Sequence, residues 1–210
     1  MIVSKQLERM NAVVVFRSDG FSVPDNAAFS ALYPGPAGKG MRFVEDQITR
    51  TSVLSVPSLR LVFAVEGNRF RVDDDSGQDP GSSPLPDHFR QALEGLFPGA
   101  RPESYGFNFD VYFRFGSVLP SGAVFRSFVS DEIFRERDLR DVGVQFTMER
   151  NGGAQRETYF IKFVDPLEIA VHANIHVPSE DIPSSDGLRA RLAAAYNDIE
   201  GVVNTLKLNA

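Results

Sequence analysis

The sequence contains no cysteine, no tryptophan and only three histidines among its 210 residues. Without cysteine the chain can form neither a disulfide nor a thiolate metal site, and it has no cysteine nucleophile. No stretch has the length and apolar character of a signal peptide or of a membrane-spanning helix. We therefore expect a cytoplasmic protein that has no membrane partner.

Lysine is also scarce, because arginine supplies 18 of the 22 basic residues. Arginine suits planar, bidentate contacts, but this usage is also what a GC-rich bacterial genome would give. The formal net charge of −6 argues against a general affinity for the phosphate backbone, so a nucleic-acid partner is not expected.

Motifs that mark common catalytic and cofactor sites are missing. No G-x-S-x-G segment marks an activated serine, and the glycine-rich segment 34–40 lacks the spacing of a phosphate-binding loop. The acidic run 73–79 fails as a calcium loop, because it would place Val72 and Ser83 at ligand positions. We interpret this run as the solvated end of a hairpin, and we predict neither a metal nor another cofactor.

What the sequence does contain is alternation of apolar and polar residues, which is typical of half-buried strands. The stretch 142–177 predicts three consecutive antiparallel strands in the middle of a sheet. A two-residue turn at Asn151-Gly152 would pair Val144 with Tyr159. A three-residue loop, 166–168, would pair Phe163 with Val171 and keep the apolar residues on one face.

Further strands and helices are predicted on both sides of this stretch. A buried strand is expected at 12–16, two short strands at 41–56, and a hairpin around Gly67-Asn68 that pairs Phe63 with Val72. Residues 1–10 are mixed and fit a short helix or an arm. Helices are expected at about 22–32, 86–97, 123–135 and 185–207, the last with an apolar stripe along one side.

Together these segments predict an α+β fold. We expect an antiparallel twisted sheet of about six to seven strands with helices packed on one face, including a long C-terminal helix. Residues 1–210 are interpreted as a single domain, with 77–86 as a flexible loop or lobe boundary because this segment is rich in Gly, Pro and Ser.

Two groups of residues are candidates for a binding site. The strand at 105–115 has more aromatic side chains than a small sheet needs, and large apolar surfaces often mark interfaces. The polar side of strand 167–177 carries two histidines, which lie about 13 Å apart and cannot share one metal ion. The candidate binding residues are Tyr105, Phe107, Phe109, Tyr112, Phe113, Arg114, Glu168, His172, Asn174 and His176.

Three functions fit this sequence. The first is a non-enzymatic protein-interaction or assembly module that binds a protein partner, or a second copy of itself, through an aromatic-rich sheet face or edge. The second is a small-molecule binding protein, since a curved sheet with a long C-terminal helix resembles helix-grip folds. The third is a hydrolase-like enzyme that uses Glu168, His172 and His176.

Overall fold

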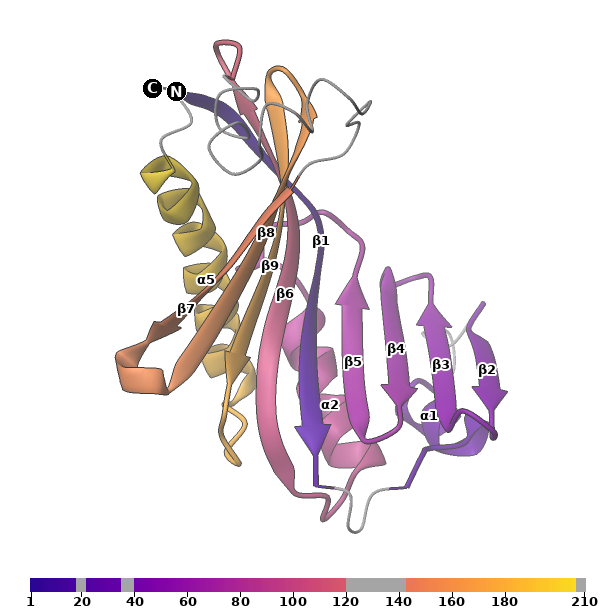
Figure 1. Cartoon of the computed structure of the whole chain (residues 1–210). Helices are drawn as coiled ribbons and strands as arrows, with labels where there is room; N and C mark the ends of the chain where they lie inside the picture. Colours follow the sequence, from indigo (N-terminus) through magenta and orange to yellow (C-terminus); the bar gives the residue numbers. More distant parts are fainter. Residues whose placement is uncertain (18–21, 35–39, 120–142, 207–210) are drawn as a thin grey trace.

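The computed structural model describes residues 1–17, 22–34, 40–119 and 143–206 (Figure 1). Within these ranges, one antiparallel sheet of nine strands has the order β2-β3-β4-β5-β1-β6-β9-β8-β7. The strands are β1 (Ile2–Phe16), β2 (Arg42–Asp46), β3 (Thr51–Val56), β4 (Leu61–Glu66), β5 (Arg69–Asp74), β6 (Pro102–Phe115), β7 (Gly143–Arg150), β8 (Gln155–Asp165) and β9 (Glu168–Val177).

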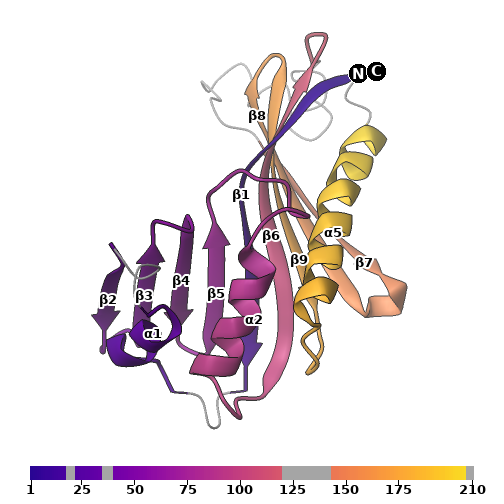
Figure 2. The ribbon, with the colours of Figure 1, turned by 180° about the vertical axis from the view of Figure 1, so that it is seen from behind.

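Three α-helices in the described ranges lie on the same face of this sheet (Figure 2). They are α1 (Asn26–Leu32), α2 (Leu85–Leu96) and α5 (Ser185–Thr205). The predicted α+β class, the antiparallel sheet and the long C-terminal helix are confirmed, but the sheet has nine strands. The helix expected at 123–135 lies outside the described residues. None of the described helices has both the length and the apolar character needed to cross a membrane.

The centre of the sheet is β1, which is 15 residues long and lies between β5 and β6. The prediction that stretch 142–177 forms the middle was wrong, because the β7–β8 hairpin lies at one end of the sheet order. The prediction of a helix or an arm for residues 1–10 was also wrong. Fewer side chains are buried in the first half of β1 than in Ala12–Phe16. This half therefore contains more polar residues, and its strand pattern is weaker.

The predicted β4–β5 hairpin is confirmed, with Val65 opposite Phe70 and Phe63 opposite Val72. Gly67 has a φ of 62°, which the first position of a two-residue type II′ turn requires and which glycine adopts at little cost. The turn residues and the alternation of apolar side chains indicate the same register, so the sequence was sufficient to predict the pairing of β4 with β5.

The β7–β8 hairpin keeps the predicted faces but differs from the predicted register by two residues. Val144 lies opposite Ile161 and Phe146 lies opposite Tyr159. The reason is that residues 151–154 form the turn, with Arg150 opposite Gln155, instead of a two-residue loop. A shift of two residues leaves every side chain on its original face, which is why parity alone could not detect it.

In the β8–β9 hairpin, the turn and the alternation of apolar residues require different registers, and a β-bulge allows both. Asp165 lies opposite Glu168 around a short turn, in which Asp165 Oδ1 accepts a 2.6 Å hydrogen bond from the Leu167 N–H. That turn alone would put apolar side chains on opposite faces. A register shift between Phe163 and Asp165 restores the match, so that Phe163 pairs with Ile169. The predicted three-residue loop was therefore wrong.

The core lies between the sheet and the three helices, and α5 contributes its predicted stripe. Ser184 caps this helix by accepting a 3.3 Å hydrogen bond from the Gly187 N–H. Similarly, Asp25 caps α1 through the Ala28 N–H, so that this helix begins a few residues later than predicted. The buried residues of α5 are Leu188, Leu192, Tyr196, Ile199, Val202 and Val203.

Candidate functional site

The aromatic residues of β6 that were predicted to form a binding surface face the helices. Phe109 and Phe113 are fully buried, and Tyr105 and Phe107 are each 2% exposed. The ring of Phe109 lies 6.1 Å from the ring of Tyr196 in α5. These four predicted residues are thus core residues, and the aromatic surplus is explained by the helix layer. A binding surface has to be formed by other side chains.

The other predicted site residues lie on the face of the sheet that carries no helix in the described ranges. We call this the helix-free face. Tyr112 is half-buried there beside Glu8, whose negative charge raises the pKa of the phenol above its ordinary value. The predicted residues on this face are Tyr112 and Arg114 of β6, and Glu168, His172, Asn174 and His176 of β9.

A row of amide side chains crosses the helix-free face. Asn174 donates to Asn108 Oδ1 over 2.5 Å, and Asn108 donates to Asn11 Oδ1 over 2.7 Å. The row continues into β8 and β7, where the hydroxyls of Thr158 and Thr147 lie 3.0 Å apart. Each member is the direct cross-strand neighbour of the next, so these bonds fix the register of the central strands.

The acid and histidine residues of β9 do not converge. His172 Nδ1 lies 2.6 Å from Asp110 Oδ1 of β6, whereas Glu168 is 3.9 Å from Arg114. His176 lies four residues beyond His172 on the same strand, and burial, with a smaller effect of the charge of Arg156, lowers its pKa. Among the described residues no group of three histidine or acidic side chains could hold a metal ion.

Two aspartates of the predicted solvated run are in fact buried. Asp73 is 2% exposed and Asp74 is 1% exposed, because both belong to β5 and not to a hairpin end. Arg9 and Arg71 each approach Asp73 within 2.9 Å, which offsets the loss of solvation. Asp74 accepts a hydrogen bond from the buried Ser83 hydroxyl, which anchors the segment before α2.

A buried glutamate was missed by the sequence analysis. Glu157 of β8 is 1% exposed and lies on the helix side of the sheet. It accepts hydrogen bonds from Arg150 at 2.8 Å, Gln155 at 2.6 Å and the Tyr159 hydroxyl at 2.9 Å. Arg150 also reaches Asp198 of α5 at 3.4 Å. This network therefore ties the end of the β7–β8 hairpin to the C-terminal helix.

Beside this network, an apolar groove runs along the edge strand β7. Among the described residues β7 is the last strand of the sheet, so its outer backbone groups have no strand partner. The groove has a volume of about 460 Å³, and the Arg150–Asp198 ion pair lies at its rim. Its lining comes from Phe146, Met148 and Arg150 of β7, from Asp198, Gly201, Val202 and Thr205 of α5, and from Leu206, which follows α5.

No protein-family model and no curated protein matches the chain. Its function therefore has to be argued from the geometry of the site. In the part of the chain that the structure describes, β7 thus combines backbone groups that have no strand partner with an apolar surface beside them.

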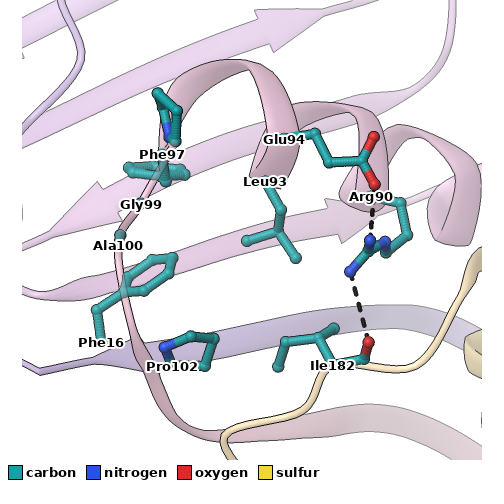
Figure 3. A pocket seen from close by; sticks show the side chains of 10 residues that line it. Phe16, Arg90, Leu93, Glu94, Phe97, Gly99, Ala100, Pro102 and Ile182 are labelled. Carbon is teal, nitrogen blue, oxygen red and sulfur yellow. Dashed lines mark hydrogen bonds and ion pairs between the residues drawn. The ribbon is translucent and has the colours of Figure 1, made fainter.

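A second groove, between α2 and the end of β1, is shown in Figure 3. It has a volume of about 350 Å³ and is bordered by Phe16, Leu93 and Phe97. Arg90 is the basic side chain of this groove, and its charge is already used. One guanidinium nitrogen is 2.6 Å from Glu94 Oε1, and another is 3.5 Å from the Ile182 carbonyl oxygen. This groove therefore offers little to a charged ligand.

Proposed function

We propose that this protein is an interaction module that binds an extended segment of a partner protein by strand addition to β7. Alternate side chains of the bound segment would enter the groove between β7 and α5. The observation that supports this proposal is that the unpaired edge and the apolar groove lie side by side. In strand addition, backbone hydrogen bonds provide affinity and pockets for alternate side chains provide specificity.

The sequence of β7 is compatible with this role. Natural edge strands are often protected from pairing by proline, lysine or a bulge. Strand β7 has no proline and no lysine, and it pairs with β8 without a register shift. Its eight residues are enough for several backbone hydrogen bonds to an added strand. Within the ranges that the structure describes, no strand pairs with the outer side of β7, so this edge can accept another chain.

The two faces of β7 specify the chemistry of the bound segment. On the helix side, Phe146 and Met148 are half-buried and line the groove, while Gln145 and Thr147 on the other side are exposed. Because side chains alternate between faces, an added strand would place every second residue against the groove. We therefore expect a segment with apolar residues at alternate positions and polar residues between them.

The two alternative functions have less support. A helix-grip binder needs an enclosed apolar cavity. Much of the space between β6, β9 and α5 is instead filled by side chains such as Phe109, Ile169 and Leu192, which have no exposed surface. The pocket of about 310 Å³ that remains between these elements is partly lined by the charged side chains of Arg150, Arg191 and Asp198. A hydrolase-like site needs its acid and bases within hydrogen-bond reach. Glu168 instead lies near Arg114, and His172 contacts Asp110.

Gly201→Lys tests the proposal, because Gly201 lines the groove and a Cβ at this position would meet no atom within 4 Å. The variant places a charge in the groove, and helix propensity favours lysine over glycine. Asn204→Lys is the matched control, since Asn204 is exposed on the same helix and lies outside the groove. We expect a partner captured from cell extract by the wild type and by Asn204→Lys to be lost with Gly201→Lys.

The binding mode is tested with a peptide from that partner. Hydrogen exchange should show new protection of the β7 amides when the peptide binds, because an added strand accepts their hydrogen bonds. Protection confined to strands other than β7, or equal capture by the Gly201→Lys and Asn204→Lys variants, would contradict strand addition at β7.

A further inference from the structure

The opposite end of the sheet is formed by β2, which among the described residues also has no strand partner on its outer side (Figure 1). This strand is five residues long and pairs with β3. Arg42, Val44 and Asp46 alternate along it and point to the helix-free face, where all three are exposed. Val44 is 65% exposed, which is high for an apolar residue inside a strand.

The charges of β2 are arranged symmetrically about Val44. Arg42 lies two residues before it and Asp46 lies two residues after it. If a second copy of β2 is placed alongside in antiparallel orientation with Val44 opposite Val44, each Arg42 lies opposite the Asp46 of the other copy. Opposite charges that face each other across two strands stabilise pairing, whereas like charges oppose it.

The neighbouring registers are less favourable. A two-fold axis at Glu45 would place Glu45 directly against Glu45 of the second copy. An axis at Phe43 would place Arg42 opposite Val44, so that neither Arg42 nor Asp46 would face an opposite charge. Only the axis at Val44 pairs both ends of the strand with opposite charges, so the sequence of β2 selects one register.

Hydrogen bonds to the following turn position the carboxylate of Asp46. Its Oδ1 accepts hydrogen bonds from the N–H groups of Thr49 at 3.3 Å and Ile48 at 2.9 Å. These bonds lower the pKa of Asp46, because they stabilise the charged form. The side chain is therefore ionised at neutral pH and has a fixed position at the end of β2.

We propose that β2 is a homodimer interface, in which two copies of this chain pair antiparallel through β2 about a two-fold axis at Val44. Such an axis is perpendicular to the sheet, so the helices of both copies lie on the same side of one continuous sheet. Because the paired strand is short, the dimer is weak, reversible and sensitive to salt. The inference is independent of the proposed function, since β7 lies at the other end of each sheet.

Charges introduced at Val44, on the symmetry axis, provide the test. Val44→Lys and Val44→Glu each place like charges opposite each other in a homodimer, while the mixture of the two variants places lysine opposite glutamate. The monomer should fold in both cases, because Val44 is mostly exposed. Val118→Lys is the matched control, because Val118 is 70% exposed and follows β6, which β3, β4, β5 and β1 separate from β2 in the sheet order.

The measurement is sedimentation of each sample over a range of protein concentrations, with circular dichroism to verify folding. We expect the wild type and Val118→Lys to dimerise. Each Val44 variant should have a dimer dissociation constant at least about tenfold higher. The equimolar mixture should recover dimers. A monomeric wild type, unchanged dimerisation of Val44→Lys, or a mixture that stays monomeric would each overturn the proposed interface.

Arg42 gives a second, independent comparison, because it is exposed and its substitution should leave the fold intact. Arg42→Glu should weaken the dimer, since it would face Asp46 with a like charge, while Arg42→Lys should retain it. Equal dissociation constants for these two variants would overturn the proposed charge pairing.

Discussion

The Tyr159 hydroxyl donates a 2.9 Å hydrogen bond to Glu157, two residues earlier on the same buried face of β8. Burial, together with this carboxylate, raises the pKa of Tyr159, so that the phenol stays protonated and remains a donor. Arg150 and Gln155 complete the shell of donors around Glu157. The charge of this buried carboxylate is therefore compensated by donors from the two strands of one hairpin.

Glu157→Ala should lower the free energy of unfolding by about 3 kcal/mol, because breaking a buried ion pair leaves its partners unsatisfied. The effect should be at the low end of the usual range, since the Arg150 side chain is 38% exposed and also reaches Asp198. Glu157→Gln should cost less, because it keeps an acceptor for Tyr159. Urea unfolding measures both changes.

Glu149→Ala is the control for this prediction, because Glu149 is an exposed glutamate on the neighbouring strand β7. We expect it to change the free energy of unfolding by less than about 0.5 kcal/mol. A change for Glu157→Ala as small as that of the control would show that the buried network adds no stability.

The sequence was sufficient for some parts of the fold and not for others. Gly67-Asn68 defined the β4–β5 register because one turn type fits this dipeptide and the apolar parity agrees with it. At Asp165-Pro166 the turn and the parity disagree, and the bulge that reconciles them leaves no local signal. The length of β1 was missed because polar residues cover its first half.

The same distinction applies to the site. The contact between His172 and Asp110 depends on β6 lying beside β9, and no local pattern shows this pairing of strands far apart in sequence. Glu157 could have been found, since it shares the parity of Tyr159 and Ile161 and must therefore face the core. The groove along β7 depends on where α5 lies, which only the packed structure shows.

Leu192→Ala should destabilise the protein by about 2–5 kcal/mol, as do other truncations of buried leucines. Leu192 has no exposed surface and lies in the stripe of α5 that packs against the sheet. Thermal or urea unfolding measures the change. Ile48→Ala is the comparison, since Ile48 is 95% exposed and its truncation should have little effect. A wild-type melting curve for Leu192→Ala would mean that α5 is not part of the core.

Two glycines should respond to alanine in opposite directions. Gly201 lies inside α5 with open space around its Cα, so Gly201→Ala should raise the free energy of unfolding by about 1 kcal/mol. At Gly106 of β6 a Cβ would lie 2.4 Å from the Ile175 carbonyl oxygen, so Gly106→Ala should destabilise the sheet by about 1–3 kcal/mol. Melting temperatures that shift in the same direction would contradict this reasoning.

His88 of α2 should make the stability depend on pH. Burial lowers the pKa of His88 below its ordinary value of 6.5, although Gln91 and the charge of Asp87 act in the opposite direction. The Tyr33 hydroxyl lies 3.1 Å from Nδ1, and burial raises the pKa of Tyr33, so this phenol is a donor to the neutral imidazole. The folded protein therefore favours uncharged His88.

The sign of the pH effect follows from this preference. Below pH 6.5 the unfolded chain binds a proton at His88 that the folded chain resists, so the free energy of unfolding falls as the pH drops below 6.5. Above that pH both states are neutral and this group has no effect. Urea unfolding of the wild type and of His88→Gln between about pH 8 and pH 5 measures the contribution. The variant should lose less stability than the wild type on acidification, whereas parallel curves would show that His88 is not responsible.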